Sequence, residues 1–329
     1  MRIPLSILDL APIARGETVA SSIAASVALA RAAEESGYER VWYAEHHNMP
    51  SIASSATSVL IAHVGAQTST IRLGAGGVML PNHSPLTIAE QFGTLETLHP
   101  GRIDLGLGRA PGSDQNTLRA LRRDPMSSDS FPQDVLELQG YLTGPTRIQG
   151  VEATPGKGTD VPLYILGSSL FGARLAAQLG LPYAFASHFA PNALQDAVAI
   201  YRRDFQPSAQ LDAPHVIAGV NVIAADSAAE AQQMFQATKR ARVSLFFGNG
   251  REFSDDEADM ILDSPQGQHV AQMMKYSAVG TPDAVLEYLD EFTAHADADE
   301  LIVAHQSTGT EARLRSVQLL ADVAGLVRV

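Results

Sequence analysis

The chain contains 329 residues, of which 45% are hydrophobic and 18% are charged, a composition that supports a large core and excludes disordered, collagen-like and low-complexity proteins. The formal net charge is −13 and Lys and Arg form no dense basic stretch, so nucleic acid and anionic membranes are poor partners. Cysteine is absent, which excludes disulfides, thiolate metal sites and a cysteine nucleophile and is compatible with a reducing cytoplasm.

Short apolar or β-branched segments alternate along the chain with longer Ala-rich segments of helical period, a pattern typical of a parallel sheet with crossover helices. The segments expected to be strands are 3–8, 40–44, 71–80, 103–107, 161–166, 182–186, 215–224 and 300–305. The segments expected to be helices are 21–36, 54–67, 84–98, 133–142, 171–179, 192–205, 227–240 and 281–295. Gly37 stands where a helix end favours glycine, and Pro282 stands at the first position of a helix.

The even spacing of these units predicts a single (β/α)8 barrel. At roughly 150 residues per domain the length would also allow two domains, but no linker or change in composition divides the chain, which favours one domain over residues 1–329. Two long insertions, at about 110–158 after the fourth strand and 243–277 after the seventh, interrupt the pattern. Because barrel chemistry lies at the carboxyl ends of strands, we expect these insertions to form lids or substrate walls.

No run of about 18 apolar residues is present, so no membrane-spanning helix is predicted. The first residues lead directly into a strand pattern, without the apolar stretch and small-residue cleavage site of a signal peptide. We therefore expect a cytoplasmic protein.

Glu45, His46 and His47 follow the second predicted strand. Strand alternation places His46 on the same face as Trp42, with Glu45 and His47 on the opposite face. An isolated histidine at a strand end often satisfies loop carbonyls, but the carboxyl ends of barrel strands form the active-site rim. This position therefore favours a general acid or base at His46.

We predict no metal site. His83, His188 and His305 lie near other strand ends, but the chain contains neither an H-x-H nor an HExxH pattern that would bring ligands together.

The segment 74–77, Gly-Ala-Gly-Gly, interrupts the third predicted strand, although glycine weakens the interior of a strand. Either a bulge or barrel corner lies there, or a flat ligand lies directly against the main chain. We favour the ligand.

The segment 106–112 has the glycines of a dinucleotide-binding loop, but Pro111 stands where the third glycine is required and no long helix follows. A Rossmann site is therefore excluded. Arg109 remains, directly after a strand, and is suited either to a phosphate or to an ion pair at the rim.

Ser168 and Ser169 precede a helix that has Gly172 in its first turn. Such hydroxyls can simply cap the helix, but together with the free N–H groups and the helix dipole they also favour an anion. Paired with Arg109, this position indicates a phosphorylated cofactor. His188, which ends the sixth strand, can line the same mouth. The arginines of the first insertion, Arg119, Arg122 and Arg123, could close over the phosphate, although a solvated basic face is the simpler interpretation.

Taken in order, four segments resemble the bacterial luciferase-like flavin monooxygenases: VWYAEHH (41–47), RLGAGGVMLP (72–81), HPGRIDLGLGRAPG (99–112) and LYILGSSLFGARLAAQLGLPYAFASHF (163–189). The resemblance covers nearly the whole chain. It implies a barrel whose mouth binds reduced FMN, supplied by a separate flavin reductase, and uses O2 to transfer one oxygen atom to a small organic substrate. It also implies a homodimer.

The resemblance assigns roles to individual residues. His46 matches the catalytic acid–base beside the flavin, with Glu45 and His47 as its neighbours, and Gly76-Gly77 matches a non-proline cis peptide under the flavin ring. The residues expected around the cofactor are Ala75, Gly76, Gly77, Gly108, Arg109, Ser168, Ser169, Phe171, Gly172 and His188. The luciferases themselves have cysteine where Gly108 stands, so a luciferase is not predicted.

Two alternatives remain open. Relatives with the same fold bind a deazaflavin and transfer hydride without O2, although the larger tail of that cofactor favours a more basic groove than a net charge of −13 suggests. The second alternative is a protein that binds flavin but has no catalytic activity. The presence of the Glu45-His46-His47 triplet argues against it. Leu8, Leu10 and Phe189 near strand ends indicate a partly apolar substrate pocket. The residues suited to a dimer face are Ala24, Ala25, Ala28, Val59 and Ala62.

Overall fold

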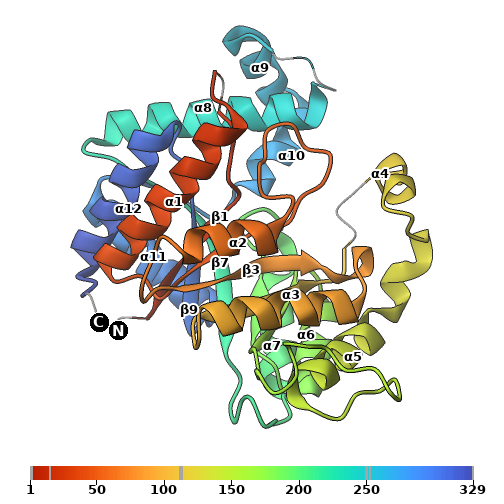
Figure 1. Cartoon of the computed structure of the whole chain (residues 1–329). Coiled ribbons are helices and arrows are strands. Elements are labelled where there is room, and N and C mark those ends of the chain that lie inside the picture. Colours follow the sequence, from red (N-terminus) through yellow and green to blue (C-terminus); the bar gives the residue numbers. More distant parts are fainter. Residues whose placement is uncertain (1–2, 15, 111–113, 249–250, 252, 328–329) are drawn as a thin grey trace.

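The computed structural model describes the chain except residues 1–2, 15, 111–113, 249–250, 252 and 328–329 (Figure 1). Pro111, on which the exclusion of a dinucleotide loop rests, lies outside the described residues.

The described residues form a closed parallel β-barrel surrounded by helices, which confirms the predicted (β/α)8 fold. The ring consists of β1 (Leu5–Asp9), β2 (Arg40–Tyr43), β3 (Arg72–Met79), β4 (Ile103–Gly108), β5 (Leu163–Gly167), β6 (Tyr183–Phe185), β7 (Val216–Ala224) and β9 (Glu300–His305). Each strand pairs with the next, and β9 closes the ring by pairing with β1.

The predicted helices are present with small shifts of their ends. They are α1 (Val19–Ser36), α2 (Thr57–Gly65), α3 (Pro85–Leu98), α5 (Phe131–Thr143), α6 (Leu170–Leu179), α7 (Leu194–Asp204), α8 (Ala228–Phe247) and α11 (Pro282–Ala296). Gly37 ends α1 in the left-handed conformation, with φ of 84°, as predicted. A helix that the sequence pattern did not reveal, α12 (Thr310–Ala324), follows the last strand and packs beside α1 (Figure 1).

Both predicted insertions carry regular structure. The first holds the short α4 (Gln115–Ala120) before α5, and the second holds α9 (Asp255–Leu262), α10 (Pro265–Met273) and the strand β8 (Ser277–Gly280). Helix α8 continues seven residues beyond its predicted end because Val243 packs in a small separate core with α9 and α10. Strand β8 pairs only with β7 and stays outside the ring. Its four residues are too few for a recognisable alternation.

The barrel interior is filled by the inward-facing side chains. They are Leu8, Trp42, Ala44, Tyr164, Ala184, Ile217 and Ile302. Trp42 has no exposed surface, and a Cβ added at Gly74 or Gly76 would lie 2.8 Å from its side chain. The register between β3 and β4 also shifts between Ala75 and Val78, which is the bulge weighed above. Close packing against Trp42 therefore explains Gly74 and Gly76 without a ligand, and the ligand beside them stays a prediction.

A buried ionic network closes the amino-terminal end of the barrel. Arg40 Nε lies 2.9 Å from Glu300 Oε1, and its Nη1 lies 2.8 Å from Asp104 Oδ2. The same guanidinium donates to the Tyr164 hydroxyl at 2.9 Å, and the Trp42 indole N–H donates to Asp104 at 3.0 Å. Four strands, β2, β4, β5 and β9, are joined in this way.

Among the described residues, no helix has both the length and the apolar character needed to cross a membrane.

Replacing Arg40 by Met should lower the free energy of unfolding by about 1.5–3 kcal/mol, because Asp104 and Glu300 lose their shared partner while Asp104 keeps Arg72 and Glu300 keeps His215. Urea unfolding followed by circular dichroism measures the change. Arg203→Met is the control, because Arg203 is exposed and pairs only with the adjacent Asp204, and should leave the midpoint nearly unchanged. Equal midpoints for the two variants would show that the Arg40 network does not stabilise the barrel.

Candidate active site at the barrel mouth

Glu45 is the centre of a hydrogen-bonded cluster beside the barrel mouth. Its side chain is only 2% exposed, and Oε1 lies 2.6 Å from Nε2 of His47 and 2.7 Å from Nε2 of His83. Oε2 accepts a hydrogen bond of 3.1 Å from the backbone N–H of Met79. The cluster therefore joins the segment after β2 to the carboxyl end of β3. The sequence pattern indicated Glu45 and His47 but not their contact with His83, which lies 38 residues away in the chain.

The hydrogen bonds determine the charge of this cluster. Burial opposes ionisation of Glu45, but the hydrogen bonds from His47, His83 and the Met79 N–H lower its pKa to about 2. The hydrogen bond to Glu45 raises the pKa of His47, against the opposing effect of burial. An ionised carboxylate only accepts, so both Nε2 atoms carry a proton and donate to it.

The ligand atoms of Glu45, His47 and His83 lie within 4.8 Å of one another, a set of residue types that could hold a metal ion. Both nitrogens lie at hydrogen-bond distance from the same oxygen, and the three groups satisfy one another without an ion. The absence of a metal site stays a prediction, and the three converging side chains are the place where metal binding would be tested.

His46 and His188 supply imidazoles with unused nitrogen atoms. The Nδ1 atom of each is buried and has no partner of hydrogen-bond geometry among the described residues. Burial lowers the pKa of His46, against a smaller opposing effect of the Ala44 carbonyl. Burial, followed by the nearby Arg242 and His46, lowers the pKa of His188 to about 3. Both rings are therefore neutral at pH 7 and lie near each other, as their predicted place at the mouth requires.

The His188 ring fits beside β7 because residue 219 is a glycine. His188 follows β6, and a Cβ at Gly219 of β7 would lie 2.5 Å from its Nδ1. Asn221 of β7 donates to the His188 carbonyl at 2.7 Å and so holds the backbone in place.

Arg109, Ser169 and Phe171 come together where β4 and β5 end. Arg109 Cζ lies 4.2 Å from the centre of the Phe171 ring, in the first turn of α6. Arg109 is exposed and has no ion pair among the described residues, so the alternative of an ion pair at the rim is not seen. Ser169 is the N-cap residue of α6, yet its hydroxyl makes no capping hydrogen bond. A cation, a free hydroxyl and a helix N-terminus thus lie together, as a phosphate requires.

The other predicted cofactor residues lie on β3 and at the start of α6. Ser168 is exposed beside Ser169, and Gly172 is buried in the first turn of α6. The peptide bond between Gly76 and Gly77 is cis, as the resemblance implied. The Ala75 side chain is fully buried in the outer core, so only its backbone is free to face a ligand.

Gly108 differs from the other glycines of the mouth. A Cβ there would meet only the Val78 carbonyl oxygen, at 3.8 Å, so the position has room for a side chain. Packing therefore does not explain why glycine stands where the luciferases have cysteine.

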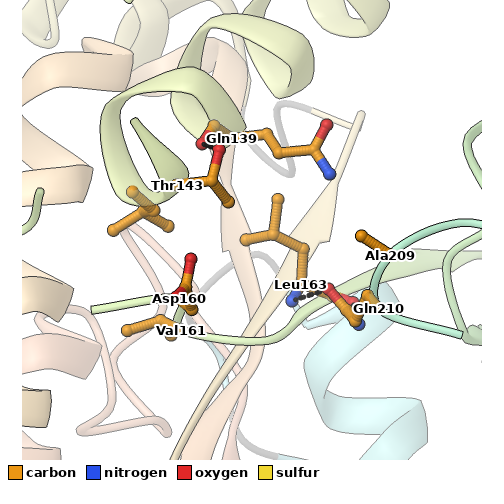
Figure 2. A pocket seen from close by; sticks show the side chains of 8 residues that line it. Gln139, Thr143, Asp160, Val161, Leu163, Ala209 and Gln210 are labelled. Carbon is orange, nitrogen blue, oxygen red and sulfur yellow. Dashed lines mark hydrogen bonds between the residues drawn. The ribbon is translucent and has the colours of Figure 1, made fainter. Parts of the chain in front are cut away.

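The surface depression of about 400 Å³ shown in Figure 2 lies elsewhere. It is next to Leu163, the first residue of β5, and therefore at the amino-terminal end of the barrel. The Gln210 side chain accepts a hydrogen bond of 3.0 Å from the backbone N–H of Leu163 and donates one of 2.8 Å to the Leu163 carbonyl. Because parallel barrels place their chemistry at the opposite end, this depression is not the candidate site.

The model of the luciferase-like monooxygenase family matches residues 3–299. The chain belongs to this family. It is 50% identical over 324 residues to a luciferase-like monooxygenase of Escherichia coli strain K12, covering 98% of this chain and 97% of the relative. It is 32% identical over 335 residues to the N-acetyl-S-alkylcysteine monooxygenase of Bacillus subtilis strain 168, covering 97% of this chain and 98% of the relative.

Solved structures agree with the fold. The crystal structure of apo-MsnO8 has a TM-score of 0.89 and 36% identity, and covers 99% of both chains. A type II Baeyer–Villiger monooxygenase of Pseudomonas putida in complex with FMN has a TM-score of 0.73 at 16% identity and covers 99% of both chains. An F420-dependent secondary alcohol dehydrogenase has a TM-score of 0.71 at 14% identity and covers 100% of both. The last two likenesses concern the fold alone.

Glu45→Gln should lower the pKa of His47, because the charged partner that raises it is lost. His47 contributes stability that is complete below the ordinary histidine pKa near 6.5 and is lost as the pH rises through the raised value. Glu45 contributes stability above about pH 4.5 that is lost as the pH falls towards 2. The pair therefore stabilises the fold most between about pH 4.5 and 6.5.

NMR titration of the imidazole resonances, together with melting temperature against pH, measures this effect. Glu35→Gln, at an exposed position of α1, is the matched control and should change neither quantity. A His47 titration that is the same in Glu45→Gln and in the unaltered protein would contradict the assigned hydrogen bond.

Proposed function

We propose that the protein is an FMN-dependent monooxygenase that oxidises a small, partly apolar organic substrate with O2. One oxygen atom enters the substrate and the other leaves as water, while reduced FMN is oxidised to FMN. We further propose that a separate reductase supplies the reduced flavin, as the resemblance to the luciferase-like flavin monooxygenases implies. Membership of the luciferase-like monooxygenase family supports the reaction class.

The observation that carries the cofactor assignment is the position of Arg109 beside the N-terminus of α6, where the Ser169 hydroxyl makes no capping hydrogen bond. Arg109, the Ser169 hydroxyl and the first N–H groups of α6 would hold the FMN phosphate. The flavin ring would then lie beside the backbone of Gly76 and Gly77, towards the half-buried imidazole of His46 and the buried imidazole of His188. FMN supplies the activation of O2, and the residues of the barrel mouth exclude water from the reaction.

His46 is proposed to be the acid–base residue. Its imidazole is neutral at pH 7, because burial lowers its pKa, and its Nδ1 has no partner of hydrogen-bond geometry among the described residues. Such a ring can accept a proton from the substrate or the reduced cofactor and return it. Glu45 and His47 act as positioning residues, since the Glu45 cluster holds the segment that carries His46 against β3.

A deazaflavin-dependent dehydrogenase is the second candidate, favoured by one observation of this chain. Arg119, in α4, and Arg122 are exposed and have no ion pair among the described residues, so they are free to meet the longer anionic tail of that cofactor. The fold is shared with an F420-dependent enzyme. A direct comparison of the cofactors decides between the two.

We also propose that the protein is a homodimer. Of the residues suited to the dimer face, Val59 of α2 is 68% exposed, whereas Ala25 of α1 is 4% exposed and packs within its own chain. A dimer would therefore use α2 more than the buried side of α1.

Arg109→Met should weaken binding of FMN about 10- to 100-fold, because the phosphate loses a charge-assisted hydrogen bond. Fluorescence titration with FMN, riboflavin and F420, in oxidised and reduced forms, measures the change. Riboflavin lacks the phosphate, so its binding should not change. Arg174→Met, at an exposed position of α6, is the control. Equal losses for FMN and riboflavin would contradict the phosphate site, and an unaltered protein that binds no flavin would overturn the proposed function.

His46→Ala should retain FMN binding but lose substrate oxidation by about 10²- to 10⁴-fold, the usual contribution of a general acid–base residue. Because a relative at 32% identity is named for N-acetyl-S-alkylcysteine, N-acetyl-S-benzylcysteine with chemically reduced FMN and O2 is the first assay. Incorporation of labelled oxygen into the product is measured by mass spectrometry. The control is His269→Ala, at an exposed position of α10. Oxidation at the unaltered rate by His46→Ala would exclude this role.

A further inference from the structure

Two opposite faces of helix α8 contact different parts of the molecule. Gln236 and Arg240 lie one helical turn apart and both donate hydrogen bonds to Oδ1 of Asp259 in α9. The distances are 2.7 Å from Gln236 Nε2 and 2.8 Å from Arg240 Nε. Arg240 also pairs with Asp255 at 2.6 Å. Figure 1 shows α9 and α10 beside the end of α8, outside the ring of strands. This face of α8 therefore binds the second insertion.

The opposite face of α8 lies over the barrel mouth. Thr238, two positions from both Gln236 and Arg240 and hence about 200° around the helix from each, donates to the Gln306 carbonyl at 2.9 Å. Gln306 directly follows β9 and donates to Asn221 of β7 at 3.0 Å. Asn221 in turn bonds the backbone of His188, after β6. This face consequently contacts the segment after β9 directly, and Gln306 and Asn221 connect that contact to β7 and to the backbone after β6.

Arg242 shares that face, because residues four positions apart on a helix lie one above the other. It is half-buried, and its positive charge helps to lower the pKa of the buried His188 imidazole. It has neither a hydrogen bond nor an ion pair with any residue that the structure describes. Arg240, two residues earlier, has two carboxylates. The chain has 36 acidic and only 23 basic residues, yet none of the acidic residues that the structure describes pairs with Arg242.

A partly buried guanidinium without a partner is unfavourable in a folded protein. Such a group in a cleft is suited to an anion that arrives with a ligand, and the planar guanidinium matches a carboxylate through two parallel hydrogen bonds. The FMN phosphate already has a separate free cation in Arg109 at the β4 and β5 ends. The ligand that remains for Arg242 is the organic substrate.

We propose that Arg242 binds a carboxylate of the substrate at the barrel mouth, so that this enzyme acts on organic anions with an apolar body. The proposal rests on the proposed monooxygenase function. Phe189, which is 41% exposed and has its ring centre 5.3 Å from that of His188, is placed to contact the apolar body. Leu10, which packs at the edge of the barrel interior, offers a second apolar surface. Arg242 thus determines specificity, and His46 remains the catalytic residue.

The test compares carboxylic acids with their neutral methyl esters. N-acetyl-S-benzylcysteine, phenylacetate and hexanoate, each with its ester, are titrated by calorimetry into the protein saturated with oxidised FMN. The variants are Arg242→Met, Arg242→Lys and the control Arg174→Met on the exposed surface of α6. FMN and riboflavin affinities are measured for each variant, and the same acids are titrated into the protein without flavin.

The unaltered protein should bind at least one acid more tightly than its ester. Arg242→Met should weaken that acid about tenfold or more, leaving the ester, FMN and riboflavin unaffected. Arg242→Lys should restore part of the loss, because the charge returns without the planar geometry. Arg174→Met should change nothing.

Three results would overturn the proposal: no acid preferred over its ester by the unaltered protein, equal losses for acid and ester in Arg242→Met, or a loss of FMN affinity without a loss of riboflavin affinity. The last would assign Arg242 to the cofactor phosphate. Failure of the proposed function is distinguishable from these results. A protein that binds no flavin but still binds the acids through Arg242 would refute the monooxygenase assignment and retain the anion site.

Discussion

The packing of the Trp42 indole inside the barrel is the constraint on which the candidate site depends. The ring is fully buried, and its N–H donates a hydrogen bond to Asp104. Asp104 also pairs with Arg40, so the indole is fixed to the ionic network at the amino-terminal end of the barrel. It also leaves no room for side chains at Gly74 and Gly76. The Trp42 and Leu8 side chains fill the space beside Gly76, and the backbone of β4 fills the space beside Gly77. The same packing fixes the course of β3 through the Gly76-Gly77 peptide, beside which the proposed flavin ring would lie.

The distribution of charge divides the molecule into two parts. At the amino-terminal end of the barrel every buried charge is paired, because Arg40 is shared between Asp104 and Glu300. At the carboxyl end, Arg109 and Arg242 have no anionic partner among the described residues. A cation that is partly withdrawn from water, as Arg242 is, lowers stability unless an anion pairs with it, whereas the exposed Arg109 is simply available to a ligand. The contrast between the two ends supports both a phosphorylated cofactor and an anionic substrate at the mouth.

The histidines of the mouth show how environment separates residues of one type. His47 donates to an ionised carboxylate and has a raised pKa, whereas the adjacent His46 has no such partner and its pKa is lowered by burial. Both residues follow the end of β2 outside any strand, and of the two only His47 reaches the Glu45 carboxylate. One neighbour holds the local structure, and the other is left free for proton transfer.

Local pattern was enough to determine the eight barrel strands and the helices between them, though not α12 after the last strand, together with the left-handed end of α1 at Gly37 and the position of His46, Arg109 and Ser169 at strand ends. These features depend on residues close together in the chain, where periodicity and helix-end signals act. The contacts of the site required the tertiary structure. Arg40 meets Glu300 across 260 residues and Glu45 meets His83 across 38, and no local pattern encodes such pairs. The free face of α8 that carries Arg242 likewise emerged only once the helix was packed, because a side chain lacks a partner only relative to everything that folds around it.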